Sequence, residues 1–209
     1  KWNVGKVTDM SFLFHQASTF NRNLSMWDVS EVVNMDTMFN GAKSFNGDLS
    51  KWNVGSKVTD MQSMFSQAIA FNGDLSKWNV GKVTYMQWMF SQALSFNGDL
   101  SKWTVDKVTN LASMFRQARA FNGDLSTWDV GQVLNMDGMF NGAKSFNQGL
   151  STWNVAQVVS MSWTFSQARA FNGDLSEWNV EKVTNMEGMF YQASAFNQDI
   201  AKWNVGKVK

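Results

Sequence analysis

Residues 71–96 read FNGDLSKWNVGKVTYMQWMFSQALSF, and near copies of this stretch fill the whole chain. Tryptophan marks each copy, at Trp2, Trp27, Trp52, Trp78, Trp103, Trp128, Trp153, Trp178 and Trp203. The step is 25 residues, except between Trp52 and Trp78, where an extra Ser56 or its neighbour makes it 26. A period of this size is typical of supersecondary units that stack on copies of themselves. We therefore expect a repeat solenoid of eight 25-residue coils.

Each coil carries a strand-like pattern followed by a helix-like one. Trp27 and Val29 are two residues apart, so in a short parallel strand both side chains lie on one face. Apolar residues then recur at i, i+3, i+4 and i+7, which predicts one face of a short helix: Met35, Met38, Phe39 and Ala42. Asn46-Gly47 is a turn signal before the next coil. The expected coil is a short strand, a connection, a short helix and a turn.

Columns of equivalent residues predict the core and the turns. Two phenylalanines six residues apart and an alanine between them recur in every coil, as in Phe39, Ala42 and Phe45, and we assign these columns to the core. An asparagine follows the second phenylalanine in every coil, and its side chain is expected to bond its counterpart one coil away or the backbone of a tight turn.

A column of acids follows the Asn-Gly turn in most coils, as in Asp48 and Asp74. Stacked carboxylates suit Ca²⁺, but each coil supplies one acid there and Asn23 and Gly149 interrupt the column. A solvated turn acid is the favoured interpretation.

Composition argues against catalysis. The chain has no cysteine and a single histidine, His15, at a variable position, so we expect no metal site, no cofactor and no enzyme activity. The formal net charge of +1 gives no electrostatic footprint for nucleic acid. No apolar stretch approaches 18 residues, which predicts no membrane insertion by this segment.

The phrase quoted above resembles the 25-residue repeat of the DUF285 family, known from surface proteins of mycoplasmas and some protists and itself similar to BspA-like leucine-rich repeats. The resemblance covers all eight coils. It implies a leucine-rich-repeat-like solenoid, a cell-surface or extracellular location and roles in adhesion or binding, but no catalytic residues. Val32 stands where ordinary leucine-rich repeats place an asparagine ladder, so a straighter superhelix is an equal alternative to a horseshoe.

One variable column is the candidate binding surface. It lies two residues after the first core methionine, and most coils fill it with a small residue. Three coils fill it with a large aromatic residue instead: Phe12, Trp88 and Trp163. Aromatic side chains exposed in a row stack on sugars or anchor a protein partner, and Tyr85 is a weaker companion. The alternatives are that these rings cover gaps at the side of the solenoid, or that they reflect duplication of a three-coil block.

Two functions follow from this organisation. The first is a non-enzymatic, surface-exposed scaffold for adhesion, which binds a protein or glycan through repeated shallow contacts. The second is a structural filament or coat component that assembles end to end or side by side. Residues 1–209 form one continuous array, and the absence of polar capping coils predicts an internal segment of a longer chain.

Overall fold

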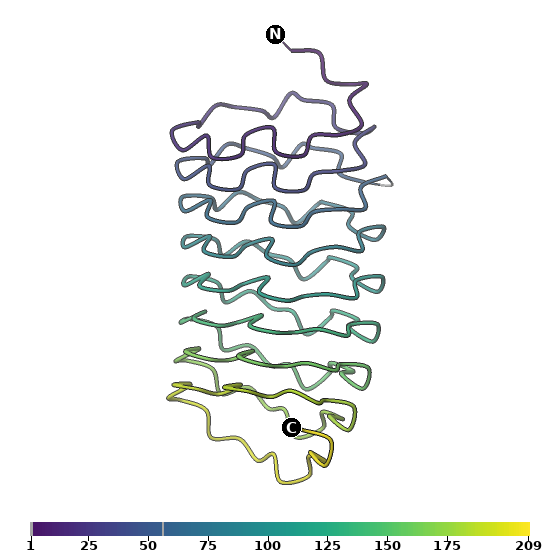
Figure 1. The fold of residues 1–209 in the computed structure, drawn as a ribbon. Coiled ribbons are helices and arrows are strands. Elements are labelled where there is room, and N and C mark those ends of the chain that lie inside the picture. Colours follow the sequence, from purple (N-terminus) through teal and green to yellow (C-terminus); the bar gives the residue numbers. More distant parts are fainter. Residues whose placement is uncertain (1, 56) are drawn as a thin grey trace.

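The computed structural model describes residues 2–55 and 57–209, and shows a straight stack of flat coils with the two termini at opposite ends (Figure 1). We number the coils from their tryptophans: 2–26, 27–51, 52–77, 78–102, 103–127, 128–152, 153–177 and 178–202, with 203–209 beginning a ninth. The extra residue predicted at Ser56 lies outside the described residues.

The predicted strand and helix of each coil are wrong. The described residues contain no helix, and only 4% of the chain is in strand-like pairing. That pairing is a ladder of isolated parallel bridges, one residue per coil, which runs from Asp9 through Asn34 and onward to Asn185. The leucine-rich-repeat-like coil with a strand and a helix is therefore not the structure of this chain.

Left-handed backbone replaces the predicted helix. Thr37 and Gly41 have φ values of 59° and 72°, and the equivalent residues of the other coils are also positive, which interrupts any right-handed helix at two points. Between these points the chain makes a tight turn, in which Asn40 N donates to Thr37 O at 3.1 Å.

The remaining amides of this segment point along the stack. Met35 N donates to Asp60 O at 3.0 Å, and Phe39 N donates to Met64 O at 2.8 Å, both in the next coil. Every second peptide between residues 34 and 41 bonds in this way. Hydrogen bonds between coils thus take the place of the i to i−4 bonds of a helix.

The core prediction is confirmed. The side chains at i, i+3, i+4 and i+7 still point inward, because the tight turns preserve that spacing, and Met35, Met38, Phe39 and Ala42 are fully buried. Each phenylalanine stacks on its equivalent in the next coil, as Phe39 does on Phe65 with ring centroids 5.5 Å apart. The core is therefore a set of aromatic and aliphatic columns that run the length of the stack.

The asparagine column is a ladder between coils. The Oδ1 atom of each asparagine accepts a hydrogen bond from the backbone amide of its counterpart in the next coil, as in Asn46 N to Asn21 Oδ1 at 3.0 Å and Asn122 N to Asn97 Oδ1 at 2.8 Å. Of the two roles predicted for this column, the structure shows the bond to the next coil.

Candidate functional site

The aromatic column consists of Phe12, Thr37, Ser63, Trp88, Ser113, Gly138, Trp163 and Gly188, and every member has a positive φ, between 54° and 62°. The backbone of the coil imposes this conformation, which glycine adopts freely and other residues adopt at a cost of about 1–2 kcal/mol. Aromatic residues are therefore unexpected here. Phe12, Trp88 and Trp163 are nevertheless present and are 55%, 41% and 37% exposed.

Side chains in this column lean toward the next coil. A Cβ atom added to Gly188 would lie 2.6 Å from the Trp163 ring, and one added to Gly138 would lie 3.2 Å from Ser113 Oγ. The three large rings lie three coils apart, roughly 14–15 Å at the spacing of hydrogen-bonded strands. They form a row of separate rings along the side of the stack.

A second variable column flanks the aromatic column: His15, Asn40, Ser66, Ser91, Arg116, Asn141, Ser166 and Tyr191. Each large ring has a partner in this flanking column. The His15 ring meets Phe12 edge-on at 5.6 Å, the Arg116 guanidinium lies 5.9 Å from the Trp88 ring centroid, and Tyr191 meets Trp163 edge-on at 5.9 Å. These contacts hold one side of each ring and leave the remainder exposed.

An open pocket of about 290 Å³ lies between the two tryptophans, centred on Gly138. Its lining comes from three successive coils: Ser113, Arg116, Asp137, Gly138, Asn141, Ser162 and Trp163. The space exists because Gly138 has no side chain to extend toward the next coil. The equivalent residue of the preceding coil, Ser113, has only a small one. Trp163 forms one wall.

Asp137 is held in a fixed orientation beside this pocket. Its Oδ1 atom accepts hydrogen bonds from Ser160 Oγ at 2.5 Å, from Ser162 N at 2.8 Å and from Ser162 Oγ at 2.7 Å. All three donors belong to the next coil. The carboxylate is thus preorganised, with a charge of opposite sign to Arg116 on the same pocket.

The acid column at the Asn-Gly turn has a structural role. Asp74 Oδ1 accepts the Ser76 amide at 2.9 Å, and Asn23 Oδ1 accepts the Ser25 amide at 2.8 Å in the same geometry. The Ser76 hydroxyl and amide lower the pKa of the Asp74 carboxyl below its usual value. Within residues 2–55 and 57–209 no group of three or more His, Cys, Asp or Glu side chains is placed to hold a metal ion.

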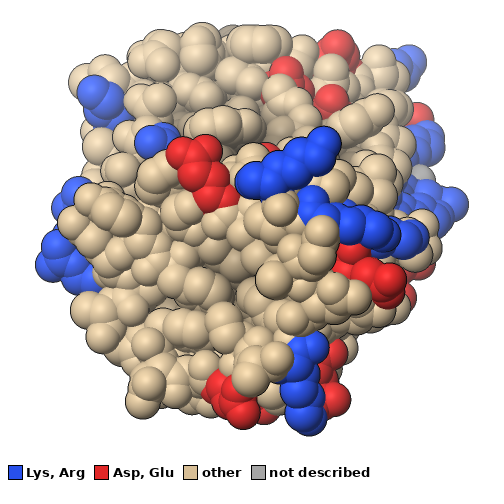
Figure 2. All heavy atoms as spheres, turned by 60° about the horizontal axis from the view of Figure 1, so that its bottom comes forward, with Lys and Arg blue, Asp and Glu red and all other residues tan. Residues whose placement is uncertain are grey.

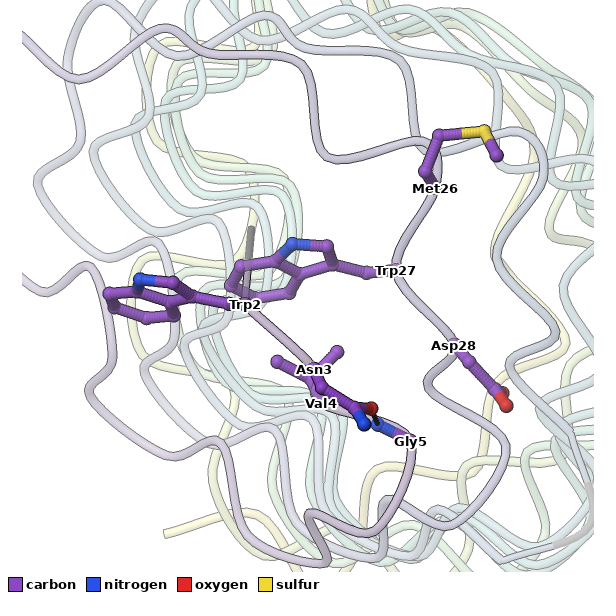
Figure 3. A pocket seen from close by; sticks show the side chains of 7 residues that line it. All are labelled: Trp2, Asn3, Val4, Gly5, Met26, Trp27 and Asp28. Atoms are coloured by element: carbon purple, nitrogen blue, oxygen red, sulfur yellow. Dashed lines mark hydrogen bonds between the residues drawn. The ribbon is translucent and has the colours of Figure 1, made fainter.

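The N-terminal end carries two shallow pockets around Trp2 and Trp27, whose rings stack at 5.8 Å (Figure 3). Asn3 folds its side chain back onto its own turn, where Oδ1 accepts the Gly5 amide at 3.3 Å. These pockets lie on the end face of coil 1.

The C-terminal end is the complementary face. A broad uncharged area occupies much of it, with charged side chains mostly toward its rim (Figure 2). An apolar hollow there is lined by Met186, Gly188, Met189, Phe190, Tyr191, Ile200, Trp203 and Val205. Both ends therefore expose the cross-section of the core.

The four predicted site residues are all exposed aromatic residues, but the structure does not bring their rings into contact. No two of the Phe12, Trp88, Trp163 and Tyr85 rings contact each other in the described part of the chain. Tyr85 is half exposed and sits on the bridge ladder between Asp60 and Asn110, outside the aromatic column. The sequence reasoning named Tyr191 as a further weak companion and Gly138 as a member of the variable column, but it missed Arg116, Asp137 and Asn141, although the variability of the flanking column was visible in the sequence.

The repeated coils, stacked by hydrogen bonds and aromatic columns, define this chain as a tandem-repeat protein. It belongs to the DUF285 family, described as Mycoplasma protein of unknown function, whose model matches residues 1–56, 55–148 and 123–209. No curated protein matches the chain. Among the described residues, none forms a helix long and apolar enough to cross a membrane.

Proposed function

We propose that this chain is a non-enzymatic binding scaffold of a cell surface, which contacts a protein or glycan partner through the aromatic column. The observation that carries the proposal is the presence of Phe12, Trp88 and Trp163 at backbone positions that disfavour large side chains. Equivalent positions use serine, threonine or glycine without loss of the coil. A large ring kept exposed at such a position is more useful for a partner than for folding.

Three rings in one row favour a ligand that is itself extended or repeated. Each ring offers a shallow contact. Because the rings are fixed on one rigid stack, a ligand bound at one ring is held at a high effective concentration near the next ring. A row with gaps of three coils matches a polymer or a surface that carries several copies of the same group. An adhesive role would use this geometry directly.

A binding screen with matched variants tests the proposal. The purified chain is passed over immobilised matrix proteins and glycans, beside a Trp88→Ser/Trp163→Ser double variant and a Thr37→Ser control. Thr37 belongs to the same column but is buried. We expect the double variant to lose at least about tenfold in affinity and the control to lose none. Equal retention of all three proteins would refute a role for the aromatic column.

A second candidate function is end-to-end assembly, favoured by the polarity of the two end faces. In the last coil the amides equivalent to those that bridge the coils belong to Met186, Gly188, Phe190 and Gln192, and none donates to a backbone carbonyl in the described chain. In the first coil the carbonyls of Asp9, Ser11, Leu13 and His15 accept no backbone amide there. Donors at one end and acceptors at the other, with apolar surface at both, suit head-to-tail stacking.

This candidate ranks second because residues 203–209 already occupy part of the next coil. Lys209 N donates to Thr184 O at 3.0 Å, so a second copy in register meets its own residues 2–8 at the same place. Sedimentation velocity over a wide concentration range tests assembly, with Val205→Glu as the variant at the half-exposed edge of the apolar hollow. Growth into rods that Val205→Glu prevents would favour assembly over binding.

A further inference from the structure

The pocket over Gly138 combines an aromatic wall with fixed polar groups of both charges. Trp163 lines the pocket, and its ring also lies close to Gly188 and Tyr191 of the next coil. Arg116, Asp137 and Asn141 border the same space. The pocket is therefore neither an apolar gap nor a site of one charge.

The polar groups favour an uncharged ligand with several hydroxyl groups. An anion that approached Arg116 would also meet the Asp137 carboxylate, and a cation that approached Asp137 would meet the Arg116 guanidinium. The planar side chains of Arg116, Asp137 and Asn141 together offer both donors and acceptors. Hydroxyl groups use both kinds of partner without bringing a charge into the site.

The tryptophan adds a requirement for a flat apolar surface on the same ligand. An indole face packs well against C–H groups, and its contribution is non-directional burial beside the directional hydrogen bonds. A pyranose ring has this composition, with C–H groups on its faces and hydroxyl groups around its edge. An open pocket of about 290 Å³ gives room for one such ring with its neighbours outside.

A nearly identical coil segment shows what opens the pocket. Residues 34–46 and 135–147 have the same sequence except for Thr37 in the first and Gly138 in the second. In coil 2 the Thr37 side chain is buried, with Oγ1 bonded to Asp36 Oδ1 at 2.7 Å. The glycine removes that side chain, and the following coil then carries Trp163 where coil 3 carries Ser63. The absence of a side chain at Gly138 and the presence of a tryptophan at Trp163 thus occur in successive coils, whereas Thr37 is followed by Ser63.

We propose that the Gly138 pocket binds one ring of a neutral saccharide, with Trp163 against the ring face and Arg116, Asp137 and Asn141 on its hydroxyl groups. This inference rests on the proposed binding role of the aromatic column and names neutral saccharides as the ligand class of that column at the Gly138 pocket.

The duplicated segment supplies variants with built-in controls. Gly138→Thr recreates the sequence of coil 2 and fills the pocket, with a residue that the same backbone already accepts at Thr37. Asn141→Ala removes one polar group without adding bulk. The controls lie at the equivalent positions of coil 2, where the next coil carries Ser63 in place of Trp163: Thr37→Gly is the reverse of the first change, and Asn40→Ala repeats the second. Near-ultraviolet circular dichroism checks that each variant folds.

Saturation-transfer NMR measures binding of neutral di- and trisaccharides of glucose, galactose, mannose and N-acetylglucosamine, beside a sialylated trisaccharide as the acidic probe. We expect at least one neutral probe to receive saturation from the wild-type chain. Gly138→Thr and Asn141→Ala are expected to reduce this transfer at least fivefold, and both coil 2 controls to retain it. The inference would be overturned if no neutral sugar received saturation at millimolar concentration, if only the acidic probe received it, or if Gly138→Thr and Asn141→Ala transferred as much saturation as the wild-type chain.

Failure of this inference is distinguishable from failure of the proposed function. If no saccharide binds but the chain is retained on a matrix protein through Trp88 and Trp163, the binding role stands and the sugar pocket is wrong. If the double variant also behaves as wild type on every surface, both are wrong.

Discussion

The indole Nε1 of Trp153 donates a 2.9 Å hydrogen bond to the carbonyl oxygen of Leu125, 28 residues earlier in the chain. The same bond recurs from Trp52, Trp78, Trp103, Trp128, Trp178 and Trp203. The Trp153 ring also stacks on Trp128 and Trp178, at 6.5 and 6.3 Å. The tryptophan column therefore joins each coil to its neighbours by one directional bond and by aromatic packing.

Trp153→Phe is expected to lower the free energy of unfolding by about 0.5–1.5 kcal/mol, because it keeps an aromatic ring but removes one of the two hydrogen bonds that the Leu125 carbonyl accepts, the other coming from the Trp128 amide at 3.0 Å. Urea denaturation followed by circular dichroism measures the change. Trp2→Phe is the control: Trp2 is 65% exposed at the open end, and its replacement should change stability by less than about 0.5 kcal/mol. Equal effects at the two positions would contradict a special role for the buried indole.

Asn97→Ala should remove one step of the asparagine ladder. The Oδ1 of Asn97 accepts the Asn122 amide at 2.8 Å, and its loss is expected to cost about 0.5–1.5 kcal/mol. Hydrogen exchange provides a local readout, since the Asn122 amide should exchange faster than in the wild type. Asn97→Asp keeps an oxygen acceptor and should protect the amide. An Asn122 amide that exchanges at the wild-type rate in Asn97→Ala would refute the ladder.

Trp88→Ser and Trp163→Ser should each change the free energy of unfolding by less than about 1 kcal/mol. Serine already occupies the same column at Ser63 and Ser113, with φ values of 54° and 56°. Loss of ring packing on Arg116 or Tyr191 is partly offset by relief of a large side chain at left-handed φ. Destabilisation well above that limit, measured by urea denaturation, would identify the two rings as packing residues and remove the basis of the proposed function.

Stability should fall in acid through the turn acids. Hydrogen bonds from Ser76 and Ser101 hold the pKa of Asp74 and Asp99 below the ordinary value of 3.8. Because the folded pKa is lowered, this contribution is present above pH 3.8 and is lost as the pH falls through the folded values. Asp60 acts in the opposite direction, since burial raises its pKa.

A matched variant isolates this effect. Asp74→Asn/Asp99→Asn keeps the oxygen that accepts the serine amide, as Asn23 does, but cannot titrate. We expect near wild-type stability at pH 7 and a smaller loss of stability between pH 4 and pH 2, measured by thermal unfolding. An unchanged acid dependence would show that other groups control it.

The sequence predicted which side chains are buried better than it predicted the backbone. The spacing of Met35, Met38, Phe39 and Ala42 correctly placed these residues on one inward face. It could not distinguish a helix from a series of tight turns, because both put i, i+3, i+4 and i+7 on one side. The deciding feature was positive φ at Thr37 and Gly41, and a threonine at a left-handed position has no signature in a single sequence.

The sequence was enough to predict the aromatic column, but not the neighbours of its rings or the pocket beside them. The sequence showed large residues where most coils have small ones, and the structure finds Phe12, Trp88 and Trp163 exposed there. The direction in which these rings lean depends on left-handed backbone, so neither Arg116 as the partner of Trp88 nor the contact of Tyr191 with Trp163 was foreseen. The pocket at Gly138 also combines three coils, which no single repeat reveals.

The central structural claim is that contacts between coils, rather than elements within a coil, stabilise this protein and hold the aromatic column in place. Deletion of residues 98–122 tests it, because joining Asn97 to Gly123 removes one 25-residue repeat and restores the same local sequence. We predict that the shortened chain folds and unfolds in urea at a lower midpoint, since one coil and one interface are lost. An unchanged midpoint, or a chain that no longer folds, would contradict the claim.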